Sequence, residues 1–97
     1  RNDNLYVNEI APRVHNSGHL TINAYNVSQF ENHVRAVCSL KQIALKKISN
    51  AEMINIIGNQ ITYYRQNPKL NEKQFFFDYL KKDIKENRKM GHLTTLM

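Results

Sequence analysis

The chain has 97 residues and a formal net charge of +6, and 41% of its residues are hydrophobic, including five tyrosines and four phenylalanines. This composition excludes a disordered chain and is typical of one small domain or of a piece of a larger protein. No apolar run approaches the roughly 20 residues that a membrane-spanning helix needs, so we expect no membrane partner. The single cysteine excludes an intrachain disulfide and favours a reducing, cytoplasmic location.

The most informative stretch is Asn8–His19, which mixes a carboxylate, a guanidinium, imidazoles, carboxamides and a hydroxyl within a few positions. Apolar Leu5–Val7 precede it, so residues 4–11 are predicted to form a strand and residues 12–20 a loop. A core strand would bury each unpaired polar group at a cost of roughly 1–3 kcal/mol. We therefore expect a ligand site at the end of a strand.

Glu9 is the first candidate ligand-binding residue. Successive side chains on a strand point to opposite faces, so Glu9 shares a face with Leu5 and Val7. A carboxylate on an otherwise apolar face favours a cation partner, and Mg²⁺ is the plainest candidate because it prefers oxygen ligands. A salt bridge to a lysine or arginine is the alternative that the spacing leaves open.

A helix is predicted to begin after Ser28, a good N-cap, with Glu31 placed three residues later as in a capping box. Its apolar positions recur at helical spacing and form one stripe, made of Phe30, Val34, Val37 and Cys38. We expect the stripe, including the cysteine, to pack and the helix to end near Ser39. Residues 20–25 alternate loosely and predict a short strand before it.

The second half of the chain predicts a mostly antiparallel β unit that follows a connection over residues 40–50. The expected strands are residues 53–57, 61–63, 75–80 and 90–96, and the expected turns are residues 66–68 and 86–87. The aromatic side chains of the third strand recur at period two, which is typical of core packing.

Four blocks of this sequence together resemble 5-(carboxyamino)imidazole ribonucleotide synthase, the ATPase subunit of bacterial phosphoribosylaminoimidazole carboxylase. They are Asn8–His19, Ser28–His33, Met53–Gly58 and Arg88–His92, in the family's order across nearly the whole chain. The resemblance implies an α+β fold. Residues 1–40 would be the last strand, loop and helix of an ATP-grasp domain, and residues 41–97 a small antiparallel β-rich C-terminal domain. Because family members are several times longer, we expect this chain to be a C-terminal fragment.

The resemblance also implies an activity: ATP-dependent carboxylation of 5-aminoimidazole ribonucleotide with bicarbonate, through carboxyphosphate, in purine biosynthesis. By match to the motif, Asn8 and Glu9 would lie at the ATP phosphates, and Glu9 would bind Mg²⁺. The remaining ATP-binding residues are expected upstream, so the fragment alone is expected to be inactive. Family members are often dimers, so we expect a homodimer for the full-length enzyme.

The same match assigns the residues on the substrate side. Arg13 and His15 are expected to be catalytic and to contact the substrate, and the further expected substrate contacts are Asn16, Ser17, Lys82, Arg88 and Lys89. An arginine offers a planar fork of donors suited to phosphate. For Lys82 and Lys89 the alternative is a solvated run of charge. The turn at residues 86–87 lacks the Pro and Gly that the family commonly has there, which leaves the hairpin register around Lys82 open.

The sequence leaves two other functions as alternatives. Formate-dependent glycinamide ribonucleotide transformylase is a related ATP-grasp enzyme, but it typically shows His-Asp-Thr-Gly-Met in place of residues 15–19. A small basic nucleic-acid-binding module would suit the charge, yet no recognisable module of that kind is present, so we expect no nucleic-acid partner. His15 and His19 lack an identified third ligand, so no zinc site is predicted.

Overall fold

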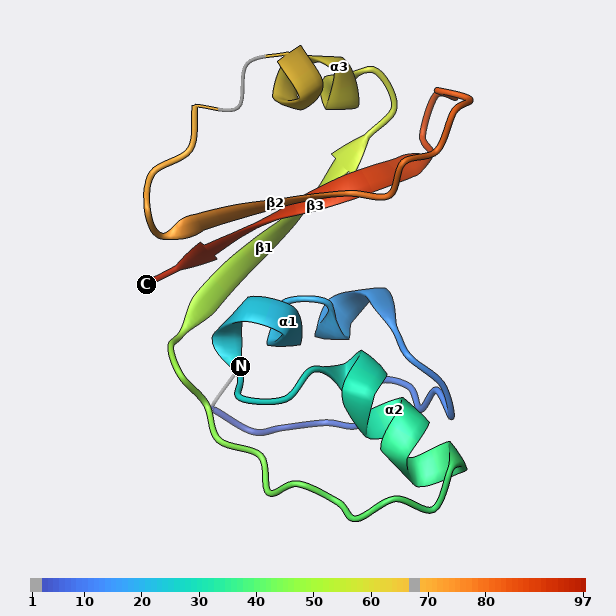
Figure 1. Ribbon diagram of the computed structural model, residues 1–97, viewed down its shortest axis with the longest axis vertical. Coiled ribbons are helices and arrows are strands. Elements are labelled where there is room, and N and C mark those ends of the chain that lie inside the picture. Colours follow the sequence, from blue (N-terminus) through green and yellow to red (C-terminus); the bar gives the residue numbers. More distant parts are fainter. Residues whose placement is uncertain (1–2, 67–68) are drawn as a thin grey trace.

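The computed structural model describes residues 3–66 and 69–97, which form a helical unit and a sheet unit. The helical unit contains the 3-10 turn η1 (Asn16–Gly18) and helices α1 (Thr21–Ala24) and α2 (Gln29–Val37). The sheet unit contains β1 (Ala51–Ile57), α3 (Gln60–Gln66), β2 (Gln74–Asp78) and β3 (Lys89–Leu96). Residues 40–50 run between the two units (Figure 1). The predicted α+β fold class is confirmed.

The sheet is antiparallel with the order β1-β3-β2, so the strand made last in the chain lies in the middle. Leu93 of β3 pairs with Ile54 on one side and with Phe76 on the other. The predicted strands at 53–57, 75–80 and 90–96 are confirmed, with bounds shifted by a few residues. The hairpin register, which the sequence left open, is fixed by the pairing of Asp78 with Gly91.

The core of the sheet unit explains why the predicted strand at 61–63 is wrong. These residues belong to helix α3, which places Ile61 and Tyr64 on one face because they are three positions apart. Ile61 is fully buried, and the Tyr64 ring stacks on Phe76 with ring centroids 5.5 Å apart. The predicted 86–87 turn is present, whereas residues 67 and 68 of the predicted 66–68 turn lie outside the described residues.

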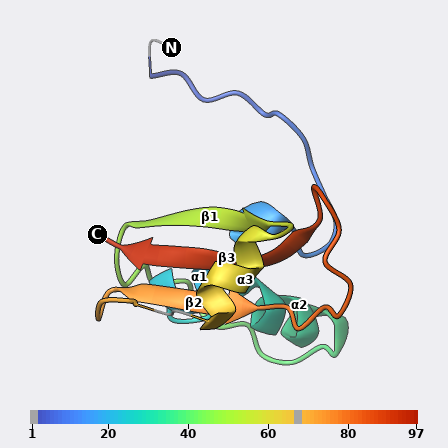
Figure 2. The same ribbon diagram turned by 90° about the horizontal axis from the view of Figure 1, so that it is seen from above.

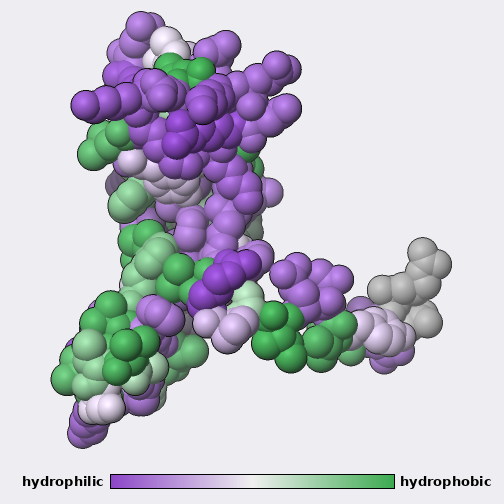
Figure 3. All heavy atoms as spheres, turned by 90° about the vertical axis from the view of Figure 1, so that its right-hand side faces the viewer, coloured by the Kyte–Doolittle hydropathy of each residue, from purple (hydrophilic) through white to green (hydrophobic). Residues whose placement is uncertain are grey.

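The N-terminal segment is extended but forms no strand, so the strand predicted at 4–11 is wrong. A strand needs a hydrogen-bonding neighbour, and none of the segments that the structure describes lies beside it. The segment projects from the body as an arm that carries both apolar and polar residues (Figures 2 and 3), and Leu5 is 99% exposed. The strand predicted at 20–25 is also wrong, because residues 21–24 form the short helix α1.

Helix α2 begins as predicted, since the Ser28 hydroxyl accepts a hydrogen bond from the Glu31 backbone at 3.1 Å. Its apolar stripe is less buried than expected: Val37 is 70% exposed, and Cys38 is exposed, so the predicted packing of this cysteine is wrong. Phe30 lies against the His19 ring, whereas Val34, one turn further along the stripe, is 53% exposed. None of the described helices combines the length and apolar character needed to cross a bilayer.

Candidate functional site

The loop after the N-terminal arm is a compact turn built around His15. This residue caps η1, and its Nδ1 atom lies 2.9 Å from the Ser17 hydroxyl and 3.2 Å from the Ser17 backbone nitrogen. The His15 carbonyl accepts from the Gly18 nitrogen at 2.9 Å. The imidazole is therefore held close to its own backbone, with its second nitrogen left to face outward.

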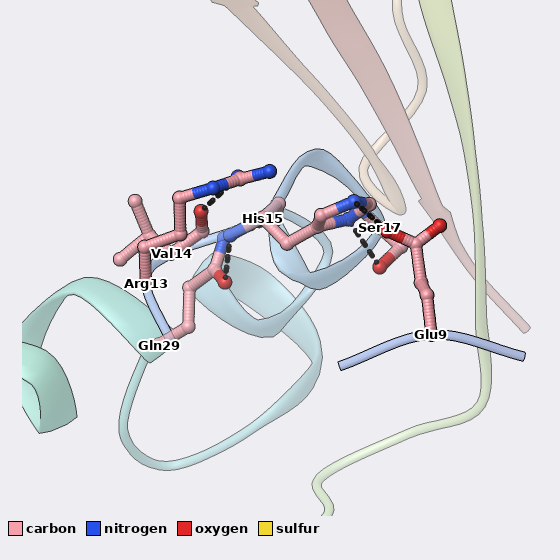
Figure 4. Close-up of polar contacts among 6 residues, drawn as sticks. All are labelled: Glu9, Arg13, Val14, His15, Ser17 and Gln29. Atoms are coloured by element: carbon pink, nitrogen blue, oxygen red, sulfur yellow. Dashed lines mark hydrogen bonds and ion pairs between the residues drawn. The ribbon is translucent and has the colours of Figure 1, made fainter. Parts of the chain in front are cut away.

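Glu9 meets this second nitrogen. Its carboxylate lies 3.7 Å from His15 Nε2, and the two side chains approach each other in Figure 4. A cavity of about 410 Å³ opens here, lined by Asn8, Glu9, Ala11, His15 and Ser17. The structure thus brings together four of the predicted site residues. The Glu9 side chain is 61% exposed, so its carboxylate stays accessible to a ligand.

Two other predicted residues of the same block point elsewhere. Arg13 donates from Nη1 to the Val14 carbonyl at 3.0 Å (Figure 4). It also lines a separate hollow beside α2. The Asn16 side chain donates to the Asn55 side-chain oxygen of β1 at 2.9 Å. Asn16 therefore ties the loop to the sheet unit in this structure and does not line the cavity.

The basic residues near the end of the chain do not line the Glu9 cavity either. Arg88 donates to the Asp83 carbonyl at 3.0 Å, which closes the loop between β2 and β3. Lys82 is exposed, and Lys89 begins β3, near enough for its charge to act on His19. In this arrangement none of the three lines the Glu9 cavity.

That second cavity, of about 480 Å³, was not predicted, and it lies where the two units meet. Its lining is made of rings and one aliphatic side chain: His19, Ile22, Phe30, Phe77, Tyr79 and His92. His92 is 1% exposed, joins the Tyr79 hydroxyl through Nδ1 at 2.8 Å, and stacks on Phe77. The sequence signal that could have indicated this cavity is that His19 and His92 each follow a glycine within the blocks that resemble the family.

Burial sets the protonation of this histidine pair, whose rings lie 5.4 Å apart. Burial, and then the neighbouring His19, lowers the pKa of His92. Burial, followed by the charges of Lys89 and His15, lowers the pKa of His19. Burial also raises the pKa of Tyr79. Burial therefore favours the neutral form of both imidazoles, and protonating either one works against the contact between the units.

We expect stability to fall in mild acid for this reason. Both folded pKa values lie below the unfolded value of about 6.5, so the unfolded chain binds more protons below that pH. The stability that the two neutral histidines contribute is fully present above about pH 6.5. It is lost as the pH falls toward the folded pKa values, and the free energy of unfolding then drops by at most about 1.4 kcal/mol per pH unit for each histidine. Urea unfolding across this range measures the slope. The variant His92→Phe, which keeps a ring on Phe77 and takes up no proton, should flatten it; an unchanged slope would contradict the assignment.

Comparison with known proteins assigns the two ends of the chain to two different domain models. Residues 1–30 match the ATP-grasp domain model, and residues 51–97 match the model of the phosphoribosylaminoimidazole carboxylase C-terminal domain. The chain thus joins part of an ATP-grasp domain to the domain that accompanies it. Neither match covers residues 31–50, so the division at residue 40 stays a prediction.

Comparison with curated relatives identifies one family among the ATP-grasp proteins. N5-carboxyaminoimidazole ribonucleotide synthase of Bacillus subtilis is 42% identical over 93% of this chain, and that of Staphylococcus epidermidis is 39% identical over 99%. The chain belongs to the N5-carboxyaminoimidazole ribonucleotide synthase family, as the four blocks predicted. It spans about a quarter of the length of these curated relatives, 24% and 26%.

Solved structures agree with this assignment. The Staphylococcus aureus N5-carboxyaminoimidazole synthetase superposes with a TM-score of 0.85 at 38% identity, covering 99% of this chain and 26% of that one. The Aspergillus clavatus synthase, solved in complex with ADP and 5-aminoimidazole ribonucleotide, gives 0.78 at 34% identity, covering 88% and 24%. The predicted fold, with the end of an ATP-grasp domain before a β-rich domain, is therefore confirmed.

Proposed function

We propose that the protein carrying this chain joins ATP, bicarbonate and 5-aminoimidazole ribonucleotide to give the carboxyamino product of purine biosynthesis. The observation that carries the proposal is the meeting of Glu9, His15 and Ser17 around one cavity, within the block that resembles the family. The names of the relatives and the ligands of the Aspergillus clavatus structure support the choice of substrate and nucleotide. A cytoplasmic location and a homodimeric full-length enzyme are parts of the same proposal.

Asn8 and Glu9 form the proposed nucleotide side of the site. Within residues 3–66 and 69–97, no three His, Cys, Asp or Glu side chains lie close enough to hold a metal together. One accessible carboxylate with a neighbouring carboxamide oxygen nevertheless fits Mg²⁺, because this ion commonly takes one or two carboxylates and completes its shell with phosphates and water. When bound, it would neutralise charge on the phosphates of ATP. Glu9 would hold the ion at the phosphates and orient it.

His15 and Ser17 form the proposed substrate side. The imidazole and the hydroxyl can both donate to a phosphate or ribose oxygen, and the turn holds them 2.9 Å apart. We propose Arg13 as the cation beside them. Its guanidinium bonds to a neighbouring carbonyl here and can reorient by side-chain rotation. Asn16, Lys82, Arg88 and Lys89 remain proposed substrate contacts that this arrangement does not bring to the cavity.

The decisive test is turnover by the full-length protein. Release of phosphate from ATP should require both bicarbonate and 5-aminoimidazole ribonucleotide. Turnover that instead required formate and glycinamide ribonucleotide would support the transformylase and overturn the proposal.

The 97-residue chain assayed alone is expected to show no such turnover. The proposal places only part of the ATP contacts in this segment, and phosphoryl transfer depends on holding the phosphates and their metal in place. The same phosphate-release assay measures this, with the full-length protein as the positive control. Substrate-dependent ATP consumption by the isolated chain would contradict the expectation.

A further inference from the structure

The side chain of Gln29, on helix α2, forms hydrogen bonds with the backbone of the His15 loop. Its Oε1 accepts from the His15 backbone nitrogen at 2.9 Å, and its Nε2 donates to the His15 carbonyl at 2.7 Å. The same Nε2 lies 2.8 Å from Nδ1 of His19. One carboxamide therefore satisfies the donor and the acceptor of the His15 backbone together, as a neighbouring strand would (Figure 4).

Gly18 leaves room for this carboxamide, and Thr21 holds the backbone of Gln29 in place. A Cβ atom at Gly18 would lie 2.5 Å from Gln29 Oε1 and 2.8 Å from its Cδ. The absence of a side chain at Gly18 therefore makes the space that the carboxamide fills. Thr21 holds the other end, because its hydroxyl accepts from the Gln29 backbone nitrogen at 2.9 Å and donates to the Gly18 carbonyl.

Holding the backbone of His15 fixes the direction in which its imidazole leaves the chain. That ring faces Glu9 at 3.7 Å and lines the cavity of the proposed site. Gln29 itself is absent from the cavity lining. It therefore acts on this cavity through the loop that it holds, by its two hydrogen bonds to the His15 backbone.

We propose that Gln29 is a positioning residue: it holds His15 toward Glu9 for the substrate, and Gly18 is required because it leaves the space for the Gln29 carboxamide. This inference rests on the proposed function. A loop displaced by about 1 Å can lower the rate roughly 100-fold.

The test compares variants of the full-length enzyme. Gln29→Ala should lower kcat/KM for 5-aminoimidazole ribonucleotide by roughly 100-fold, with the KM for ATP unchanged. Gly18→Ala should give a similar loss, because the added methyl displaces the flexible carboxamide. The double variant should be no worse than Gln29→Ala, because the methyl then has room. Gln60→Ala is the matched control: Gln60 accepts from the Ile57 backbone nitrogen at 2.9 Å and does not line the Glu9 cavity, so its loss should leave kcat/KM unchanged.

The outcomes separate the two proposals. Wild-type enzyme that does not consume the aminoimidazole ribonucleotide contradicts the proposed function. Active wild type with normal kcat/KM in folded Gln29→Ala, or losses that multiply in the double variant, contradicts the positioning role alone. If Gln29→Ala does not fold, Gln29→Glu carries the test, because it keeps the size and the acceptor while removing the donor to the His15 carbonyl. It should show the same selective loss, and normal kinetics would overturn the inference.

Discussion

Replacing Glu9 with glutamine is expected to lower kcat of the full-length enzyme by roughly 100- to 1,000-fold, the range seen when one preorganised electrostatic contact is removed. The carboxamide keeps the size of the side chain and its place in the cavity beside His15. It lacks the charge that would hold Mg²⁺ at the phosphates. Steady-state rates at saturating ATP and substrate, measured over a range of Mg²⁺ concentrations, give the effect.

A matched substitution separates this effect from a general loss of negative charge. Glu52 is an exposed glutamate on β1, and it lies outside the cavity lining. Glu52→Gln should leave kcat unchanged. Wild-type activity in Glu9→Gln, with an unaltered need for Mg²⁺, would remove Glu9 from the nucleotide side of the proposed site.

Gly91→Ala is expected to lower the free energy of unfolding by about 3 kcal/mol, the upper part of the range for overpacking. Gly91 is buried on the central strand β3, and an added Cβ would overlap the Phe77 carbonyl oxygen of β2. That oxygen belongs to the backbone, so it can move only if the strands separate.

Urea unfolding followed by tyrosine fluorescence measures this loss. Glu52→Ala, an exposed strand position, is the control and should change stability by less than about 0.5 kcal/mol. A loss below about 0.5 kcal/mol in Gly91→Ala as well would show that the close contact between β2 and β3 relaxes without cost.

Local signals account for the elements that were predicted correctly. The Ser28 hydroxyl and the Glu31 backbone that it caps are three residues apart, so their pairing is readable in one helical turn. The period-two pattern of β2 and the apolar runs of β1 and β3 are equally local. The sequence also marked Asn8–His19 as one ligand-binding block, and Glu9, His15 and Ser17 from this block line one cavity.

The wrong predictions involve contacts that no short window contains. A short apolar run such as 61–63 fits a strand or a buried helix, and the choice depends on Tyr64 meeting Phe76. The 4–11 segment has strand composition but no neighbour among the described residues. The hydrogen bonds between Gln29 and His15 join residues 14 positions apart, and the burial of His92 needs both units. Neither role can therefore be predicted from the spacing of residues within a short window.

The placement of β3 between β1 and β2 bears on how the protein matures on the ribosome. Both outer strands are made before the one that hydrogen-bonds to each of them. Until β3 leaves the exit tunnel, β1 and β2 are two unpaired edges that a chaperone or another nascent chain can bind. Sheet assembly therefore waits for the end of translation of this segment, and a premature stop before residue 89 would leave β1 and β2 without the strand that pairs with both of them.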